Sequence, residues 1–313
     1  MKLATFAGTS GPALGVVDTK RGEILDLFKA SAVRDGTPNA AFLSMLALID
    51  AGEAGMTLAR ALAEGWTPAA TRKLAETRLL APIPEPRQIR DGMFFEEHVL
   101  NAGKRVAERL GQPPPPVPKI WYERPIYYLT SRYSVAGPDH TVIWPRASKV
   151  MDFELELACV IGKNGRDIPR DAAMGHVFGY TIFNDFSARD VQALEMQGRL
   201  GPSKGKNFDG SNVFGPWIVT PDEIGNVDDL KMEARVNGER WGGGTTKAMH
   251  HKWPDVISFI SRDETIHAGE IIGSGTVGTG CGLELGRQLD DGDVVELEIE
   301  KIGVLRNKVV ASA

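Results

Sequence analysis

The alternation of apolar and polar residues in MDFELELACVIG, from Met151 to Gly162, predicts a strand with two unlike faces. Its first face is apolar and carries Phe153, Leu155, Leu157 and Cys159. On the other face Glu154 and Glu156 lie side by side, because side chains two residues apart point the same way. The two carboxylates repel each other unless solvent or a cation separates them. The next two residues on this face, Ala158 and Val160, are apolar. This weakens the alternative that the face is acidic and solvated.

Residues 1–80 are expected to form a small N-terminal domain of strands and a helical hairpin. Short apolar runs broken by turn signals predict two or three strands over residues 1–30. From Pro38 to Trp66 the apolar spacing becomes helical, with one helix ending at Gly52 and a second following it. Since this region carries no convergent polar cluster, we interpret it as a domain that packs or dimerises.

Three prolines in APIPEPRQIR mark a linker into a main domain at residues 85–313. Asp91 to Gly103 predicts a passage from strand to helix, and PPPPVP at 113–118 predicts an extended loop. Beyond Trp121, short strand runs are broken by Gly, Pro and Asp, with one helix expected at Asp185 to Leu194. The pattern therefore predicts an α+β protein that is predominantly β.

Composition narrows the functional classes. The chain has 313 residues, 42% of them hydrophobic, which suffices for a sizeable core. Its net charge of −5 disfavours nucleic acid and anionic membranes as partners. Cys159 and Cys281 make neither a disulfide framework nor a zinc site, so a cytoplasmic location is the default expectation. No stretch approaches the ~20 apolar residues of a membrane span.

Polar residues that could carry chemistry are scattered along the main domain. Asp185 follows an apolar strand and is either a helix N-cap or a third carboxylate ligand. Arg189 and Gln192, three residues apart, share one helix face on which a guanidinium could bind a carboxylate. Lys206 lies in a glycine-containing segment. The stretch from Gly273 to Arg287 is the richest in glycine, which implies that its backbone closely approaches another group.

Among the six histidines, His98 stands out because two aromatic and two acidic residues lead up to it. A general base needs an imidazole held by a carboxylate, which sequence alone does not name. We interpret four others as surface or lid candidates, namely His140, His250, His251 and His267. His176 is expected to be packed or capping. A second Glu-x-Glu pattern, at Glu296 and Glu298, is expected to be a solvated strand face.

Six motifs occur in the order typical of one enzyme family. They are Asp91 through His98, Asp152 through Glu156, Asn184 through Gln192, Gly205 through Phe208, Gly215 through Trp217, and Gly273 through Thr276 followed by Glu284. Over roughly residues 85 to 313 the chain resembles the fumarylacetoacetate hydrolase family. The resemblance implies a mixed β-roll or sandwich for the C-terminal domain and a homodimer.

The resemblance also implies a Mg²⁺ or Mn²⁺ site and roles for individual residues. The implied metal ligands are Asp91, Glu154, Glu156 and Asp185. The implied catalytic residues are His98, Glu284 as the carboxylate that orients it, Lys206 and Gln192. The implied substrate-side residues are Arg189, Tyr128 and Thr276. Oxygen-only ligation suits a hard cation and argues against zinc.

The chain departs from the family's pattern at three positions. Met93 stands where the hydrolases proper have a substrate-contacting tyrosine. Ala107 stands where they have an arginine for the substrate carboxylate, unless Arg105 or Arg109 substitutes. Asn101 stands where many smaller members have a glutamate. We therefore expect hydrolase-type machinery with a different substrate pocket.

The main functional expectation is hydrolysis of a carbon–carbon bond in a 1,3-dicarbonyl acid of the acylpyruvate or fumarylacetoacetate kind. His98 would take a proton from the attacking water, while Lys206 and Gln192 stabilise the oxyanion and the departing carbanion. The alternative is decarboxylation of oxaloacetate-like acids, or hydration, tautomerisation or isomerisation of 2-keto-enoic acids. A binding protein with a lapsed site is disfavoured, because His98, Glu284 and Lys206 are all present. In each enzymatic case the partner is a small keto acid.

Overall fold

The computed structural model describes residues 1–312, with the exception of the side chains of Arg109 and Leu110. The strands are β1 Lys2–Gly8, β2 Gly11–Asp18, β3 Glu23–Asp26, β4 Thr71–Lys73, β5 Ile89–Gly92, β6 Tyr127–Thr130, β7 Val135–Ala136, β8 Thr141–Trp144, β9 Met151–Asp152, β10 Leu155–Ile161, β11 Val177–Asp185, β12 Ser187–Ala188, β13 Asn212–Val219, β14 Lys231–Val236, β15 Glu239–Thr245, β16 Ile271–Gly273, β17 Val294–Ile299 and β18 Gly303–Ala311. The α-helices are α1 Leu27–Asp35, α2 Met45–Glu64, α3 Glu96–Leu110, α4 Lys119–Glu123, α5 Arg189–Gln197, α6 Pro221–Ile224, α7 Trp253–Ile260 and α8 Gly282–Leu285.

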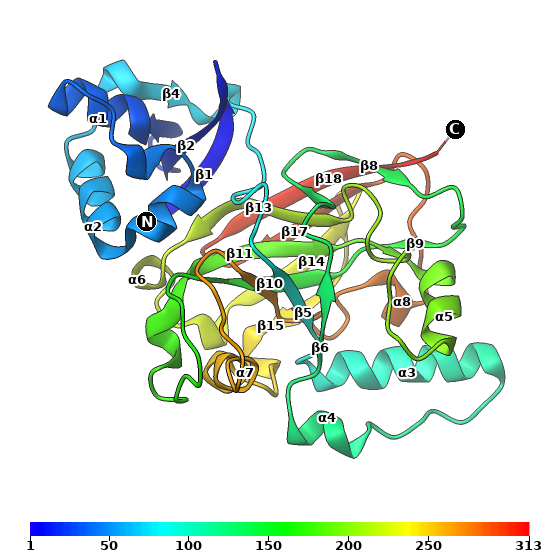
Figure 1. Ribbon diagram of the computed structural model, residues 1–313. Helices are drawn as coiled ribbons and strands as arrows, with labels where there is room; N and C mark the ends of the chain where they lie inside the picture. The colour runs from blue at the N-terminus through cyan, green and yellow to red at the C-terminus, as the bar shows by residue number, and fades with distance from the viewer. Residues whose placement is uncertain (313) are drawn as a thin grey trace.

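Two open sheets form the centre of the protein (Figure 1). The larger sheet has 11 strands in the order β4-β3-β2-β1-β13-β11-β10-β16-β5-β6, with β7 beside β13. A 5-stranded sheet follows the order β15-β14-β17-β18-β8, and β9 pairs with β12. The expected α+β, predominantly β fold class is confirmed. None of the helices in the described part of the chain combines the length and apolarity that a membrane crossing needs.

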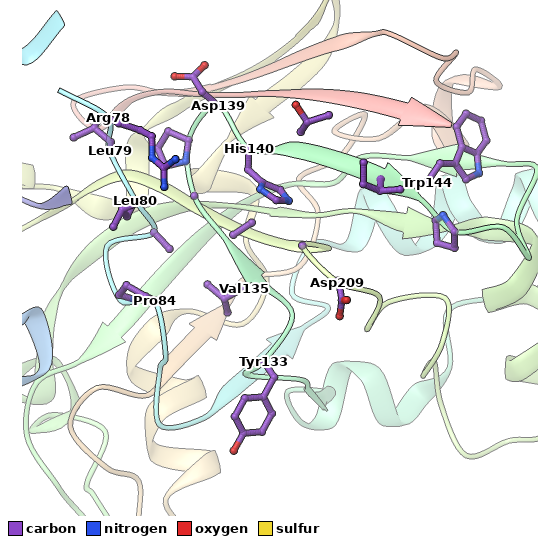
Figure 2. A pocket seen from close by; sticks show the side chains of 18 of the residues that line it. Arg78, Leu79, Leu80, Pro84, Tyr133, Val135, Asp139, His140, Trp144 and Asp209 are labelled. Carbon is purple, nitrogen blue, oxygen red and sulfur yellow. The ribbon is translucent and has the colours of Figure 1, made fainter. Parts of the chain in front are cut away.

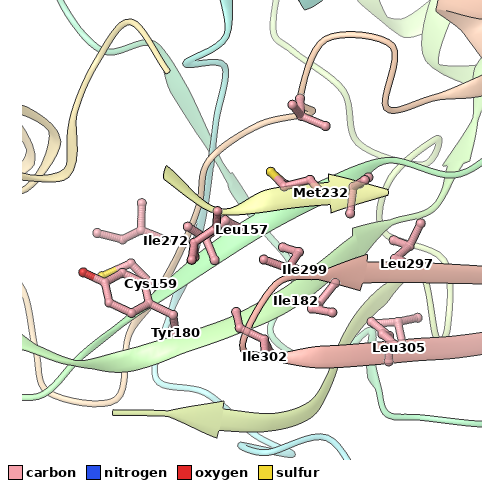
Figure 3. Packing of buried hydrophobic residues seen from close by; sticks show 14 of the residues in the cluster. Leu157, Cys159, Tyr180, Ile182, Met232, Ile272, Leu297, Ile299, Ile302 and Leu305 are labelled. Carbon is pink, nitrogen blue, oxygen red and sulfur yellow. The ribbon is translucent and has the colours of Figure 1, made fainter. Parts of the chain in front are cut away.

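Strand β10 is buried on both faces. Figure 3 shows Leu157 and Cys159 in the core between the sheets, where residues of β14, β17 and β18 face them. Ala158 and Val160 point the other way, into a second core shared with α1 and α2. Because both faces are covered, Glu154 and Glu156 are only 5% and 0% exposed, and the solvated alternative is wrong for this strand.

The predicted strand at 151–162 changes its partner near its start. Asp152 in β9 pairs with Ser187 of β12, whereas Leu155 in β10 pairs with Asn184 of β11. This change of partner interrupts the strand between Asp152 and Leu155. Because Ser187 and Ala188 form β12, the helix expected from Asp185 begins only at Arg189. The N-cap of α5 is Ala188, and the capping alternative for Asp185 is therefore wrong.

The N-terminal region joins the large sheet through β1, in which Lys2 pairs with Val219 of β13. The expected division into residues 1–80 and 85–313 stays a prediction. The predicted helix end at Gly52 agrees with the structure, because α2 consists of two helical segments that meet at a kink there. There the backbone has φ 58° and ψ −142°, a conformation open to glycine, and the two helical segments meet without a loop.

Candidate active site

Four buried carboxylates converge where β5, β10 and β11 lie near each other. Each side chain of the acidic cluster, defined as Asp91, Glu154, Glu156 and Asp185, offers one oxygen, and these oxygens lie within 4.8 Å of one another. Asp91 is on β5, Glu156 is on β10 and Asp185 ends β11, while Glu154 lies just before β10. The structure therefore brings together the four residues expected to ligate a metal.

Gly273 of β16 leaves the space that the cluster occupies. It lies between the acidic strands, pairing with Asp91 on β5 and with Ala158 on β10. A Cβ atom at Gly273 would lie 2.5 Å from Oδ1 of Asp91 and 2.8 Å from Oε2 of Glu156. Any larger residue would displace the two carboxylates. The backbone of this glycine-rich segment therefore lies close to the acidic cluster, as its glycine content predicted.

The charges of the acidic cluster are only partly compensated. Burial raises the pKa of Asp91, and burial together with the charges of Asp91 and Glu154 raises the pKa of Glu156 well above its ordinary value. Three buried oxygens of the cluster have no hydrogen-bond partner in the described part of the chain, namely Asp91 Oδ1, Glu156 Oε1 and Asp185 Oδ1. Such groups are costly unless something coordinates them. An all-oxygen set with free lone pairs fits a hard divalent cation.

Lys206 and Tyr128 bind the acidic cluster directly. The Lys206 ammonium donates to Oε2 of Glu154 at 2.6 Å and also to Asp185, and the Tyr128 hydroxyl donates to Oδ2 of Asp185 at 2.9 Å. Burial lowers the pKa of Lys206, but Asp185 and Glu154 outweigh it and hold the pKa above its ordinary value. Lys206 is therefore a charged residue already engaged by two carboxylates.

Arg189 is placed differently from the substrate-side role expected of it. Its guanidinium is buried and lies 2.7 Å from Oε1 of Glu154, while its Nε donates to Oδ2 of Asp152 at 2.8 Å. It also donates to Oε1 of Gln192 at 3.1 Å, which confirms that the two share a helix face. The guanidinium is thus held by ion pairs with Asp152 and Glu154, and Arg189 lies outside the lining of the cavity that Gln192 borders.

Asp152 is a site residue to which the sequence assigned no role. Its carboxylate accepts from the backbone N–H groups of Gly282 and Leu283 at 2.7 and 2.9 Å, and from Arg189. It therefore ties the first turn of α8, which carries Glu284, to the arginine that holds Glu154. The available signal was its position two residues before Glu154, on the same face of the alternating pattern.

Replacing Asp152 with alanine should lower the free energy of unfolding by about 3–5 kcal/mol, because Arg189 would be left as a buried charge with one partner fewer. Urea denaturation measures this directly. Asp35→Ala is the matched control, since Asp35 forms an exposed ion pair with Arg34 and its loss should leave the denaturation midpoint unchanged. Equal midpoints for both variants would contradict the structural role of Asp152.

His98 and Glu284 form a hydrogen-bonded pair beside the acidic cluster. Nδ1 of His98 lies 2.8 Å from Oε1 of Glu284, whose Oε2 accepts from Asn101 at 2.9 Å and from the Thr279 N–H at 2.8 Å. Burial opposes ionisation of Glu284, but His98 and the other donors hold its pKa below the ordinary value. An ionised carboxylate only accepts, so Nδ1 of His98 carries the proton and Nε2 is left as a base.

One cavity of about 430 Å³ is lined by His98 of the pair and by three carboxylates of the acidic cluster. Expected site residues in its lining are Asp91, His98, Tyr128, Glu154, Glu156, Gln192, Lys206 and Thr276. Oγ1 of Thr276 is buried and has no hydrogen-bond partner among the residues that the structure describes, so it can donate to a bound molecule. The lining also contains the segment from Arg199 to Pro202. Its last three residues begin the glycine-containing stretch that holds Lys206, whereas Arg199 had no predicted role.

A larger hollow of about 950 Å³ lies elsewhere on the protein, and Figure 2 shows Tyr133, His140 and Trp144 around it. The four carboxylates, all described residues, lie outside its lining. His251 also differs from its expected surface position. It is 7% exposed, and its Nε2 lies 2.6 Å from the carbonyl oxygen of Trp121, because α4 covers it. His140, His250 and His267 are exposed, as expected.

Comparison with known proteins gives a consistent family assignment. Residues 88–310 match the sequence profile described as "Fumarylacetoacetate (FAA) hydrolase C-terminal". The chain is 34% identical to the mitochondrial oxaloacetate tautomerase FAHD2B of Bos taurus, over 99% of this chain and 92% of that protein. It is 35% identical to the oxaloacetate tautomerase YisK of Bacillus subtilis, over 75% of this chain and 74% of that protein.

A solved structure agrees with the fold and with metal binding. The maleylpyruvate hydrolase of Sphingobium sp. SYK-6, determined in complex with manganese(II) and pyruvate, superimposes with a TM-score of 0.75 at 26% identity. The alignment covers 100% of both chains. That neighbour holds a divalent metal, and this chain contains a cluster of carboxylates able to hold one.

Proposed function

Because the chain belongs to the fumarylacetoacetate hydrolase family, we propose that it is a metal-dependent tautomerase that interconverts the keto and enol forms of an oxaloacetate-like acid. The observation that carries this proposal is the cavity that His98 shares with Asp91, Glu154 and Glu156 of the acidic cluster. The oxaloacetate tautomerases among its relatives support it. The proposal therefore follows the alternative drawn from the sequence rather than carbon–carbon hydrolysis.

The acidic cluster and Lys206 would hold and orient the acid. A divalent cation bound by the four carboxylates would supply Lewis acidity toward the keto and adjacent carboxylate oxygens. Lys206, held between Glu154 and Asp185, keeps a positive charge beside that end of the cavity. Thr276 Oγ1 and the Gln192 amide are neutral donors in the same lining, placed to bind oxygen atoms of the acid.

His98 is the base that moves the proton. Its free Nε2 accepts a proton from the carbon between the keto group and the distal carboxylate, and the electron pair of that C–H bond forms the enol double bond. The negative charge moves to the keto oxygen, to which His98 returns the same proton. Glu284 keeps the imidazole ring oriented and stabilises its charge while it is protonated.

Carbon–carbon hydrolysis is the second candidate, because the same His98–Glu284 pair could instead activate a water molecule. The maleylpyruvate hydrolase of Sphingobium, which shares this fold, favours keeping that candidate. Hydrolysis of oxaloacetate would yield oxalate and acetate, and decarboxylation would yield pyruvate and CO₂. Tautomerisation yields only the other form of the same acid.

The test is a stopped-flow assay with purified protein reconstituted with Mg²⁺ or Mn²⁺. Enol-oxaloacetate is mixed with the protein, its ultraviolet absorbance is followed, and the products are identified by NMR. We expect a rate of ketonisation proportional to protein concentration, with oxaloacetate as the product. Unchanged ketonisation with accumulation of oxalate and acetate would favour hydrolysis instead. A cytoplasmic location, a homodimer and the identity of the metal stay predictions.

A further inference from the structure

Cationic side chains near the candidate active site are mostly engaged by protein groups. Lys206 donates to Glu154 and Asp185, and the buried Arg189 contacts Asp152 and Glu154. Arg105, one possible substitute for the arginine missing at Ala107, donates to the carbonyl oxygen of Glu284 and pairs with Glu108. The side chain of Arg109, the other possible substitute, lies outside the described residues.

Arg199 is different, because it lines the cavity without a partner. It lies just after α5, in the segment that borders the same cavity as His98 and the acidic cluster. Within residues 1–312 its guanidinium makes no hydrogen bond or ion pair, and its side chain is exposed. Its backbone adopts φ 59°, which is uncommon for a residue other than glycine and marks a tight turn.

Apolar residues share the cavity lining with Arg199. Met196, Leu200 and Pro202 line the cavity with it, and Leu200 is 98% exposed. A leucine in water at the rim of a cavity becomes buried when a ligand fills that cavity, which lowers the local dielectric constant around Arg199. An arginine in such surroundings binds a carboxylate strongly, because its fork donates two parallel hydrogen bonds.

We propose that Arg199 binds the distal carboxylate of the substrate and so selects dicarboxylic over monocarboxylic 2-keto acids. This inference rests on the proposed function, in which the keto group and its adjacent carboxylate lie at the acidic cluster. The distal carboxylate then needs a cation elsewhere in the cavity. Among the described residues of its lining, Lys206 and Arg199 are the cations, and Lys206 is engaged by the cluster.

The kinetic test compares oxaloacetate with its 4-methyl ester, which lacks the distal charge. Arg199→Gln should raise KM for oxaloacetate by about 10-fold, since a charge-assisted hydrogen bond is lost, and should leave kcat and the KM of the ester nearly unchanged. Arg199→Lys should recover part of the affinity. Arg78→Gln is the matched control, because Arg78 is an exposed arginine in the other, larger hollow.

A binding test separates this inference from the proposed function. Isothermal titration of the Mn²⁺-loaded wild type and variants uses malate and lactate, which differ in the distal carboxylate. Arg199→Gln should weaken malate binding about 10-fold relative to its effect on lactate. Equal effects on both ligands, or an unchanged KM for oxaloacetate, would overturn the role of Arg199. A wild type inactive on oxaloacetate would overturn the proposed function, while the malate and lactate comparison would still decide on Arg199.

Discussion

Replacing His98 with asparagine should lower kcat for oxaloacetate tautomerisation by about 10²–10⁴-fold, the range typical of a lost general base. Asparagine retains a polar side chain that can reach Glu284, so the 2.8 Å contact has a substitute and the fold should survive. Its amide has no basic nitrogen to take a proton from carbon. KM should change little, because His98 is not one of the groups expected to hold the acid.

Two further variants make this prediction specific. His267→Asn is the control, since His267 is exposed and lies outside the lining of the cavity, and its kcat should equal that of the wild type. Glu284→Gln should also lower kcat, because a neutral amide cannot stabilise the protonated imidazole. Circular dichroism and a melting curve check that each variant is folded. A folded His98→Asn enzyme with unchanged kcat would remove His98 from the mechanism.

The residues of the acidic cluster were brought together by the family resemblance, because each of their motifs is a weak signal by itself. Glu154 and Glu156 stand out by their spacing and Asp185 follows an apolar strand run, whereas Asp91 comes directly after the proline-rich linker APIPEPRQIR. Yet the same Glu-x-Glu pattern recurs at Glu296 and Glu298, where the side chains are partly exposed and pair with Arg235. The two patterns differ because β10 is covered on both faces, whereas the alternating burial of β17 leaves one face open.

Other features depend on segments that are distant in sequence, and no local pattern contains them. Arg189 and Gln192 were correctly placed on one helix face, but the neighbour of that face is Asp152, which lies 37 residues from Arg189 in sequence. His251 has polar neighbours in sequence, yet it is buried beside Trp121, 130 residues away. Arg199 has no signal in the sequence, because its distinguishing feature is the absence of a partner among the described residues at the rim of a cavity.

The acidic cluster leads to a second large effect, on metal-dependent stability. Mn²⁺ or Mg²⁺ at about 100 times its dissociation constant should stabilise the wild type by about 2.7 kcal/mol, because a ligand of the native state shifts unfolding by mass action. Chelation should reverse this gain. Differential scanning fluorimetry across a metal titration measures both changes. If no divalent cation changed the melting temperature of the wild type, the metal assignment would be contradicted.

Glu156→Gln should abolish most of this metal-induced gain and, in chelator, should be at least as stable as the wild type. The lost metal response and the retained stability in chelator have one cause. Glu156 is fully buried beside Asp91 and Glu154, so its negative charge destabilises the protein without a cation but is needed to bind one. A residue that only supported the fold would lose stability in both conditions. Glu296→Gln is the matched control, since it removes a carboxylate from the partly exposed pattern on β17 and should keep the full metal response. Retention of the wild-type metal shift by Glu156→Gln would show that Glu156 is not a ligand, even if its neighbours are.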